Sequence, residues 1–586
     1  YNCSPLNHEQ KMLGSAPPRV MTKQPLVVFI HLDLGIGGAE SLVLNLAKAT
    51  LSDPNNNSAT NEETSSGKVS IYTTHCSPTH CYDEVKPPNG PLYPFVNICG
   101  SWIPRKLFFG GTALCSALRM LYLTYRAMKD NPQADVFVID VLPTGVPYLV
   151  NYCNAKAGVL FYCHFPDQLL TMDTVNGEQG SSCGSDSNGG LLIRVLKRLK
   201  RLYRGIMDKA EEVTMSYSDL VVVNSLFTRA QVEKTFPTLF LPHDDERDDE
   251  SYGERIKVLY PAIESSLSRE RATNGTEAMT INKPRTGPIV SLNRFERKKN
   301  VALLLHAYDL LLEKISKGDF TVKLPPLIIA GGYDPMNVEN VEHLSELRTL
   351  ADIILARHNL PPSKVYSPSS DQDSSTSAMT QGNASIEFYL SISNTKRKQL
   401  LSSACLWCYT PHREHFGIVP LESMDAAVPV VAIRSGGPME TIVDGVTGVL
   451  VDYEPIVVGQ EKESATVCGF ADAIAKLISH PQQAAEMGQR GKERVHEIFG
   501  METFRKQWWE LLEEAQSRGR KRHDRVCASY PSLAFSMLRS LREMFAVFLF
   551  VATLTWALTS CGILEDGTGL IGTLKVHYRR IVGDEL

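Results

Sequence analysis

Glu414-His-Phe-Gly-Ile-Val-Pro-Leu-Glu422 opens the stretch that decides the fold of the second half of this chain. Its glycine and proline predict a loop that leads into the first turn of a helix, so Glu414 is expected on the loop and Glu422 within the helix. The uncharged, Val-rich residues 428–433 then predict a buried parallel strand, and Gly436-Gly437-Pro438 ends that strand and begins another helix. This pattern gathers polar groups where a strand ends, which is where open α/β sheets bind ligands.

The length and composition of the chain limit its class. A chain of 586 residues is too long for one core, and a prior of roughly 150 residues per domain predicts about three or four units, or fewer if each is a large α/β domain. A formal net charge of -5 gives no reason to expect a nucleic-acid partner. The single CxxC, Cys405-Leu-Trp-Cys408, lies in an apolar run, so we interpret the cysteines as reduced thiols and treat a metal or redox role as the less favoured alternative.

Strand and helix patterns alternate along both halves of the chain. Buried strands are predicted in the first half at Leu26–Ile30, Val69–Thr73, Val136–Ile139, Val159–Tyr162 and from Leu220, and in the second at Pro288–Leu292, Pro326–Ala330, Ile386–Leu390 and Cys405–Tyr409. This rhythm predicts an α/β protein with two doubly wound, Rossmann-like domains that face each other across a cleft.

Composition shifts divide the chain further. We predict a disordered lead at 1–24, a first domain at 25–263, a linker at 264–287, a second domain at 288–498, a return helix with a basic segment at 499–543, a transmembrane helix at 544–564 and a lumenal tail at 565–586.

Polar residues also follow two strands of the first domain. Asp33-Leu-Gly-Ile-Gly-Gly-Ala-Glu40 comes after the first strand and before an expected helix at 41–50, so Gly37 and Gly38 would let a helix N-terminus approach a phosphate. A simple tight turn explains the same glycines. His164 directly follows a buried strand and is placed for chemistry, although an ordinary loop histidine fits that position too.

Two segments indicate a membrane. Leu191–Met207 reads as a basic amphipathic helix, which suits anionic lipid, a phosphate-bearing substrate or simply solvent. Met544–Leu564 carries no charged residue and is long enough to span a bilayer, with an interfacial or buried helix as the alternative. Because most of the nearby Lys and Arg residues precede this stretch, the bulk of the protein is expected in the cytosol.

The second domain offers a distinctive set of charges. Arg294 and Lys299 follow one strand and match a diphosphate, and we expect Lys299 to be an exposed cation. Glu414 and Glu422 can accept hydrogen bonds from sugar and ribose hydroxyls, so the set suits a nucleotide sugar without a metal ion. Glycoside hydrolysis would use a carboxylate pair but would not explain the two cations.

Five segments together resemble a known family. They are His31–Glu40, Phe161–Asp167, Asn293–Asn300, Ala330–Asp334 and Glu414–Glu422. They are similar to the motifs of retaining family-4 glycosyltransferases with the GT-B fold, and within that group to the alpha-1,3/1,6-mannosyltransferases of the dolichol-linked oligosaccharide pathway.

The resemblance implies an activity and a location. GDP-mannose would be the donor, with no cofactor and no metal, and mannosyl-chitobiosyl diphosphodolichol would receive an alpha-1,3 and then an alpha-1,6 mannose with retention, in N-glycan precursor assembly. The expected place is the endoplasmic reticulum membrane, with the catalytic domains on the cytosolic face. The resemblance also leaves room for association with other early mannosyltransferases of that pathway.

The resemblance also implies roles for individual residues. His164 and Glu414 are the catalytic candidates, His164 beside the reacting sugar and Glu414 holding the mannose. The implied donor-binding residues are Gly37, Gly38, Arg294, Lys299, Phe416, Gly417, Ile418 and Glu422. Arg294 and Lys299 would hold the diphosphate and Glu422 the ribose. Ser41 stands where relatives often carry a basic residue, which weakens one first-domain contact.

Two alternatives stay open at this point. One is another membrane-associated GT-B transferase, such as an N-acetylglucosaminyl-phosphatidylinositol synthase, although the residues around His164 and Lys299 match it less well. The other is a catalytically inactive scaffold subunit of a glycosylation complex, which would have no need to keep these charged residues together.

Overall fold

A computed structural model describes the larger part of the chain. The described residues are 25–52, 68–78, 80–105, 112–153, 156–166, 205, 207–240, 255–263, 284–318, 322–367, 384–455 and 459–528. The predicted lead at 1–24 and span at Met544–Leu564 lie outside them, as do nearly all of the predicted basic helix and most of the linker. Among the described helices, none is both long and apolar enough to cross a membrane. The C-terminal transmembrane helix therefore stays a prediction.

The first domain is built on a seven-stranded parallel sheet with the order β5-β3-β1-β6-β7-β8-β9. Its strands are β1 (Leu26–Ile30), β3 (Lys68–Thr73), β5 (Val96–Ile98), β6 (Val136–Asp140), β7 (Gly158–Cys163), β8 (Leu220–Val223) and β9 (Ile256–Val258), and its helices include α1 (Gly38–Leu51), α2 (Thr112–Asp130), α3 (Val146–Tyr152) and α6 (Leu226–Thr235). Two short strands, β2 (Asp33–Leu34) and β4 (His75–Cys76), pair beside it. The central strands are apolar except for Asp140 at the end of β6, as expected where helices cover both faces of a sheet.

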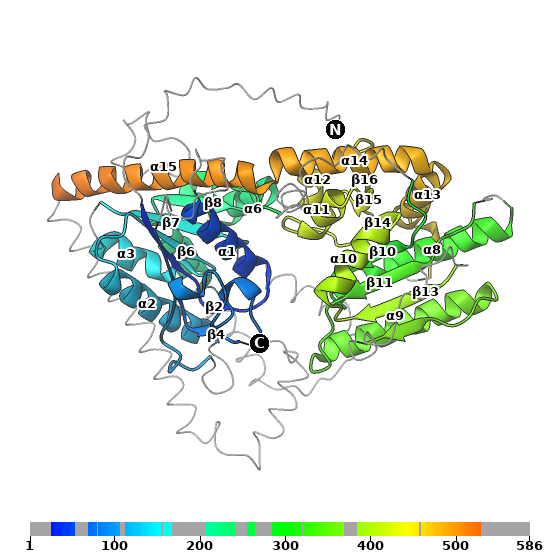
Figure 1. The fold of residues 1–586 in the computed structure, drawn as a ribbon, viewed down its shortest axis with the longest axis horizontal. Coiled ribbons are helices and arrows are strands. Elements are labelled where there is room, and N and C mark those ends of the chain that lie inside the picture. The colour runs from blue at the N-terminus through cyan, green and yellow to red at the C-terminus, as the bar shows by residue number, and fades with distance from the viewer. Residues whose placement is uncertain are drawn as a thin grey trace, which may run out of the picture.

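The second domain repeats this plan with the strand order β12-β13-β11-β10-β14-β15-β16. Its strands are β10 (Ile289–Leu292), β11 (Leu327–Gly331), β12 (Lys364–Tyr366), β13 (Ile386–Leu390), β14 (Leu406–Tyr409), β15 (Val430–Ile433) and β16 (Gly448–Val451). Its helices are α8 (Val301–Ser316), α9 (Val338–Arg357), α10 (Asn394–Ser403), α11 (Ile418–Asp425), α12 (Pro438–Thr441), α13 (Ala465–Ser479) and α14 (Pro481–Ile498). Figure 1 shows the two domains as separate lobes of the molecule. The predicted pair of doubly wound domains is therefore confirmed.

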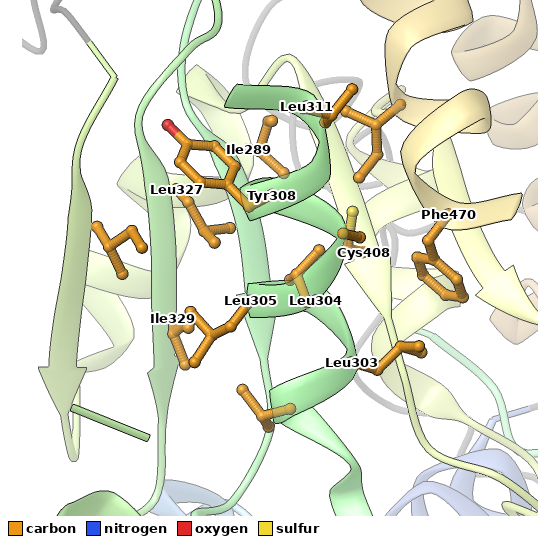
Figure 2. Packing of buried hydrophobic residues seen from close by; sticks show 14 of the residues in the cluster. Ile289, Leu303, Leu304, Leu305, Tyr308, Leu311, Leu327, Ile329, Cys408 and Phe470 are labelled. Atoms are coloured by element: carbon orange, nitrogen blue, oxygen red, sulfur yellow. The ribbon is translucent and has the colours of Figure 1, made fainter. Parts of the chain in front are cut away.

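Helix α8 is the centre of the second core. It starts after Asn300, whose left-handed backbone (φ 50°) an asparagine tolerates, and so the chain can turn from the loop after β10 into the helix. Leu304, Tyr308 and Leu311 are fully buried. Figure 2 shows side chains of α8 packed between the sheet and Phe470 of α13.

Helix α15 (Met501–Ala528) joins the two domains. The sequence pattern of 499–515 predicts an amphipathic helix that could cross back over the first domain. In the structure α15 lies along the first domain, while α14 lies over the second (Figure 1). The fully buried Trp508 stacks on Phe29 of β1, and its indole N–H donates to the Thr50 hydroxyl at 2.9 Å. Further along, the backbone of α15 passes so close to Gly158 that a Cβ there would lie 2.4 Å from the Ala515 carbonyl oxygen.

Several predicted boundaries were wrong by a few residues. Helix α1 begins at Gly38 rather than Ser41, because the Gly37 backbone is already extended and serves as its N-cap. Strand β15 begins at Val430, after Pro429, whose missing N–H cannot join the ladder. Strand β6 extends through Asp140 rather than ending at Ile139, so it includes a buried carboxylate. The edge strands β5, β9, β12 and β16 were missed because short strands carry little periodic signal.

Candidate active site

Lys299 and Glu414 form an ion pair where the order of the second sheet reverses, between β10 and β14. Lys299 ends a 3₁₀ turn after β10, and Glu414 lies on the loop between β14 and α11. The Lys299 Nζ lies 2.7 Å from the Glu414 Oε2. The Thr410 hydroxyl donates to the Lys299 carbonyl at 2.7 Å. The predicted diphosphate-binding cation and the predicted sugar-binding carboxylate are thus brought together.

The environment of this pair sets its charge. Burial alone would raise the pKa of Glu414, but the Lys299 ammonium and a hydrogen bond from Tyr409 lower it below the usual value. Burial and Glu414 together raise the pKa of Tyr409 well above its usual range. Glu414 is therefore an anion at neutral pH. The Lys299 side chain is only 12 % exposed, so the expectation of a freely exposed cation was wrong, because Glu414 draws it inward.

Glu422 lies inside α11, as predicted, and pairs with Arg397 of α10. Burial raises the pKa of Glu422, and the Arg397 guanidinium opposes that effect. Sequence reasoning missed Arg397, since α10 carries it between Lys396 and Lys398 and no motif marks one of these cations out. Only the contact with Glu422 identifies it.

The turn between Glu414 and α11 presents backbone rather than side chains. Phe416 is 5 % exposed, and its ring packs against Tyr260 and Phe499, so only its backbone can face a ligand. Gly417 has a left-handed backbone (φ 79°) that a side chain would strain, and Ile418 is the first residue of α11.

The paired glycines after β15 hold this loop in place. The Gly437 N–H donates to the Glu414 carbonyl at 2.8 Å. A Cβ at Gly436 would lie 2.2 Å from that same carbonyl oxygen, and one at Gly437 would lie 2.0 Å from the Phe416 carbonyl oxygen. The glycines are thus required for the close approach that fixes Glu414.

Arg294 pairs with a neighbouring carboxylate that was not among the predicted donor-binding residues. Its Nη1 lies 2.8 Å from the Glu296 Oε1, and its side chain is 62 % exposed. Of the two predicted cations, only Lys299 contacts a predicted carboxylate.

The glycine loop of the first domain, which contains Gly37 and Gly38, lies against the side chain of Glu40. A Cβ at Gly37 would lie 2.4 Å from the Glu40 Oε2, whereas one at Gly38 would meet nothing within 4 Å. The Tyr82 hydroxyl donates to the Gly37 carbonyl at 3.0 Å. Burial raises the pKa of Tyr82, and the charges of both Arg397 and Glu422 act on it as well. The loop therefore lies near the second domain, but Glu40 opposes an anion there.

His164 follows β7 and contacts Asp140, which sequence reasoning did not single out. Its Nε2 lies 3.1 Å from the Asp140 Oδ2, and Asp140 also contacts the His31 Nδ1. In the sequence, both His164 and Asp140 can be found as a polar residue at the end of an apolar strand. This pattern was used to select His164 but not Asp140, because the strand before Asp140 was predicted to end at Ile139.

Contacts between the domains join the loops that carry His164 and Glu414. Phe165 of the first domain stacks on His415 of the second, with 3.6 Å between ring centroids. The Ser225 hydroxyl donates to the His415 carbonyl at 2.7 Å. Since Phe165 adjoins His164 and His415 adjoins Glu414, this stack couples the placement of the two catalytic candidates.

Glu440 makes a second link between the domains. Its carboxylate accepts hydrogen bonds from the N–H groups of Leu226 and Phe227, at 2.8 and 2.6 Å, at the start of α6 in the first domain. A carboxylate is favourable there because the N–H groups and the helix dipole both attract negative charge. Burial raises the pKa of Glu440, and these N–H groups oppose that effect.

Within the described part of the chain, no group of three or more His, Cys, Asp or Glu side chains is arranged to hold a metal ion.

Comparison with known proteins gives a consistent result. A model of the family "Glycosyl transferases group 1" matches residues 280–494. The chain is 34% identical over 488 residues to the alpha-1,3/1,6-mannosyltransferase ALG2 of Rhizomucor pusillus, covering 83% of this chain and 90% of that protein. It is 34% identical over 492 residues to the human protein of the same name, covering 83% of this chain and 96% of that one.

Solved structures share the fold. Sucrose-phosphate synthase from Thermosynechococcus elongatus superposes with a TM-score of 0.50 at 17% identity, covering 84% of this chain and 99% of that one. The N-terminal domain of Candida albicans trehalose-6-phosphate phosphatase gives a TM-score of 0.51 at 9% identity, covering 84% and 97%. At these identities the likeness concerns the two-domain α/β architecture alone.

Proposed function

The chain belongs to the family of ALG2 alpha-1,3/1,6-mannosyltransferases, and from this premise we propose that it transfers mannose from GDP-mannose to a dolichol-linked oligosaccharide. The acceptor would be mannosyl-chitobiosyl diphosphodolichol, extended first by an alpha-1,3 and then by an alpha-1,6 mannose during N-glycan precursor assembly. The proposed location is the cytosolic face of the endoplasmic reticulum membrane. Its support is the uncharged stretch Met544–Leu564 with most of the nearby cations before it.

One observation carries the donor assignment. Two ion pairs, Lys299–Glu414 and Arg397–Glu422, lie in the segment that matches the glycosyltransferase family model, and the first lies at the switch point of the second sheet. We assign the diphosphate to Lys299 and Arg294 and the ribose hydroxyls to Glu422. The mannose would lie against Glu414 and the backbone of Phe416, Gly417 and Ile418.

The first domain would complete the site. Gly37 and Gly38 would approach the donor phosphates, and His164 would lie beside the reacting sugar, with Glu414 reaching the same sugar from the opposite domain. The stack of Phe165 on His415 supports this pairing, because it joins the two loops next to these residues.

The reaction that fits these groups is a front-face displacement with retention. The bond between the mannose C1 and the diphosphate oxygen breaks, the bond to the acceptor oxygen forms on the same face, and the acceptor proton passes to the departing phosphate. Lys299 would stabilise the negative charge that develops on the diphosphate. Glu414 and Glu422 would then act as hydrogen-bond acceptors rather than as an acid and a base.

The choice of donor tests the proposal. Full-length protein in detergent would be incubated with a phytanyl-linked mannosyl-chitobiosyl diphosphate, phosphatidylinositol and either labelled GDP-mannose or labelled UDP-N-acetylglucosamine. Label from GDP-mannose alone is expected in the lipid product. Incorporation from UDP-N-acetylglucosamine would favour the N-acetylglucosaminyl-phosphatidylinositol synthase alternative. Incorporation from neither donor would favour the inactive scaffold alternative. The relatives support neither of these alternatives.

A further inference from the structure

Three adjacent strands of the first sheet each deliver one residue to a common cluster. His31 follows β1, Asp140 ends β6 and His164 follows β7, and these strands are neighbours in the order β1-β6-β7. The cluster includes the switch point between β1 and β6, where a doubly wound sheet places its ligand. The cluster therefore lies at the edge of the sheet where ligands bind.

Asp140 is the centre of this cluster. Its two carboxylate oxygens lie 2.8 and 2.9 Å from the His31 Nδ1, and one of them lies 3.1 Å from the His164 Nε2. His31 is further fixed by its Nε2, which lies 2.9 Å from the Asp33 carbonyl oxygen. Asp140 and His31 are 3 % and 2 % exposed. A buried carboxylate of this kind must be paired, and here two imidazoles pair it.

The charges within the cluster balance. Burial lowers the pKa of His31, but Asp140 raises it more strongly, to about 9, with a smaller contribution from Glu40. Burial likewise raises the pKa of Asp140, but His31 and His164 lower it to about 2. At neutral pH the pair is thus an imidazolium beside a carboxylate. Asp33, whose carbonyl oxygen contacts the His31 ring, pairs its own carboxylate with Arg119 at 3.1 Å.

The backbone beside Asp140 is strained. Val141 has φ 64°, which is a rare conformation for a β-branched residue, and the Leu142 N–H donates back to the Asp140 carbonyl at 2.7 Å. Such strain persists only where the surrounding structure holds it, and it concentrates at functional sites. The turn ends β6 abruptly and leaves the Asp140 carboxylate facing both histidines.

We propose that Asp140 and His31 are positioning residues that orient His164 for the transfer reaction. Asp140 accepts the hydrogen on the His164 Nε2, which leaves Nδ1 as the ring nitrogen that can accept a hydrogen bond from a sugar hydroxyl. Among the described residues, no side chain or backbone N–H bonds to that Nδ1. The inference rests on the proposed function, because it assigns His164 to the reacting sugar.

His31 has a separate part in this arrangement. Its Nδ1 donates to the Asp140 carboxylate, and its Nε2 donates to the Asp33 carbonyl oxygen. These bonds hold the Asp140 carboxylate in the place from which it accepts the hydrogen of the His164 Nε2. His31 therefore fixes the orientation of His164 through Asp140.

Asp140→Asn tests the positioning role. While His31 donates to the new amide oxygen, the amide NH₂ faces His164, so the hydrogen of the neutral ring moves to Nδ1. We expect kcat to fall about 10- to 100-fold, as when the partner that orients a functional histidine is lost, while KM for GDP-mannose stays within about 3-fold. Asp309→Asn is the matched control, because Asp309 is 1 % exposed and contacts His358 at 2.8 Å in the second domain.

His31→Gln provides a test that does not depend on Asp140. It removes the imidazole ring that fixes the Asp140 carboxylate, so kcat should fall about 10-fold while KM for GDP-mannose stays within about 3-fold. A kcat within 2-fold of wild type in either His31→Gln or Asp140→Asn would overturn the inference. An Asp140→Asn kcat no lower than that of Asp309→Asn would overturn it too. Wild-type protein that transfers no mannose would instead refute the proposed function.

Discussion

Lys299→Ala is expected to lower kcat/KM for mannose transfer by about 10²- to 10³-fold. The substitution removes a fixed cation from the place assigned to the departing diphosphate, and the loss of one such group typically has an effect of this size. Because the ammonium also lies 2.7 Å from Glu414, the variant leaves a largely buried carboxylate without its cation. We therefore expect a stability loss of about 1–3 kcal/mol as well. Steady-state kinetics and thermal unfolding measure the two effects.

Two further variants separate the catalytic effect from the structural one. Lys298→Ala removes a neighbouring cation that is 68 % exposed and pairs with Glu296, so activity and stability should stay near wild type. Adding Glu414→Gln to Lys299→Ala removes the unpaired charge and should recover stability without recovering turnover. Normal turnover in Lys299→Ala would contradict the role assigned to this residue.

Trp508→Ala is expected to produce the largest loss of stability, about 3–5 kcal/mol. The indole is fully buried against Phe29, and its N–H bonds to Thr50, so the variant leaves both a cavity and a lost hydrogen bond. Since α15 leaves the second domain and packs on the first, the loss should loosen the junction between them. Chemical denaturation followed by circular dichroism measures the change.

A tryptophan elsewhere in the first domain serves as the control. Trp102 is 73 % exposed and contacts Tyr122 edge-on, so Trp102→Ala should change stability by no more than about 1 kcal/mol. Equal effects of the two substitutions would show that α15 contributes nothing specific to the first domain.

The parts of the fold that were predictable are those with a strong local signal. Apolar runs such as Leu26–Ile30 and Val159–Tyr162 became buried strands because fully covered parallel strands leave no polar face. The alternation of these runs with helices was enough to predict two doubly wound domains. Strands of three residues at the sheet edges, such as β5 and β9, have too few side chains to carry a pattern.

The residues of the candidate site were likewise predictable only where the local signal is strong. Glu414, Glu422 and His164 could be selected because each lies beside a strand, a glycine turn or a helix start that the sequence pattern predicts. Arg397 and the contacts of Glu440 could not be predicted, since the partners are distant in sequence: Glu422 for Arg397, and the first turn of α6 for Glu440. Only the folded chain brings these partners together.

A time course of mannose transfer tests the central claim most directly. Full-length protein, GDP-mannose and the lipid-linked mannosyl-chitobiose should give a product with one added mannose that is then converted to a product with two. Linkage-specific mannosidases should identify the first addition as alpha-1,3 and the second as alpha-1,6. An acceptor that gains no mannose, or gains it in other linkages, would contradict the account.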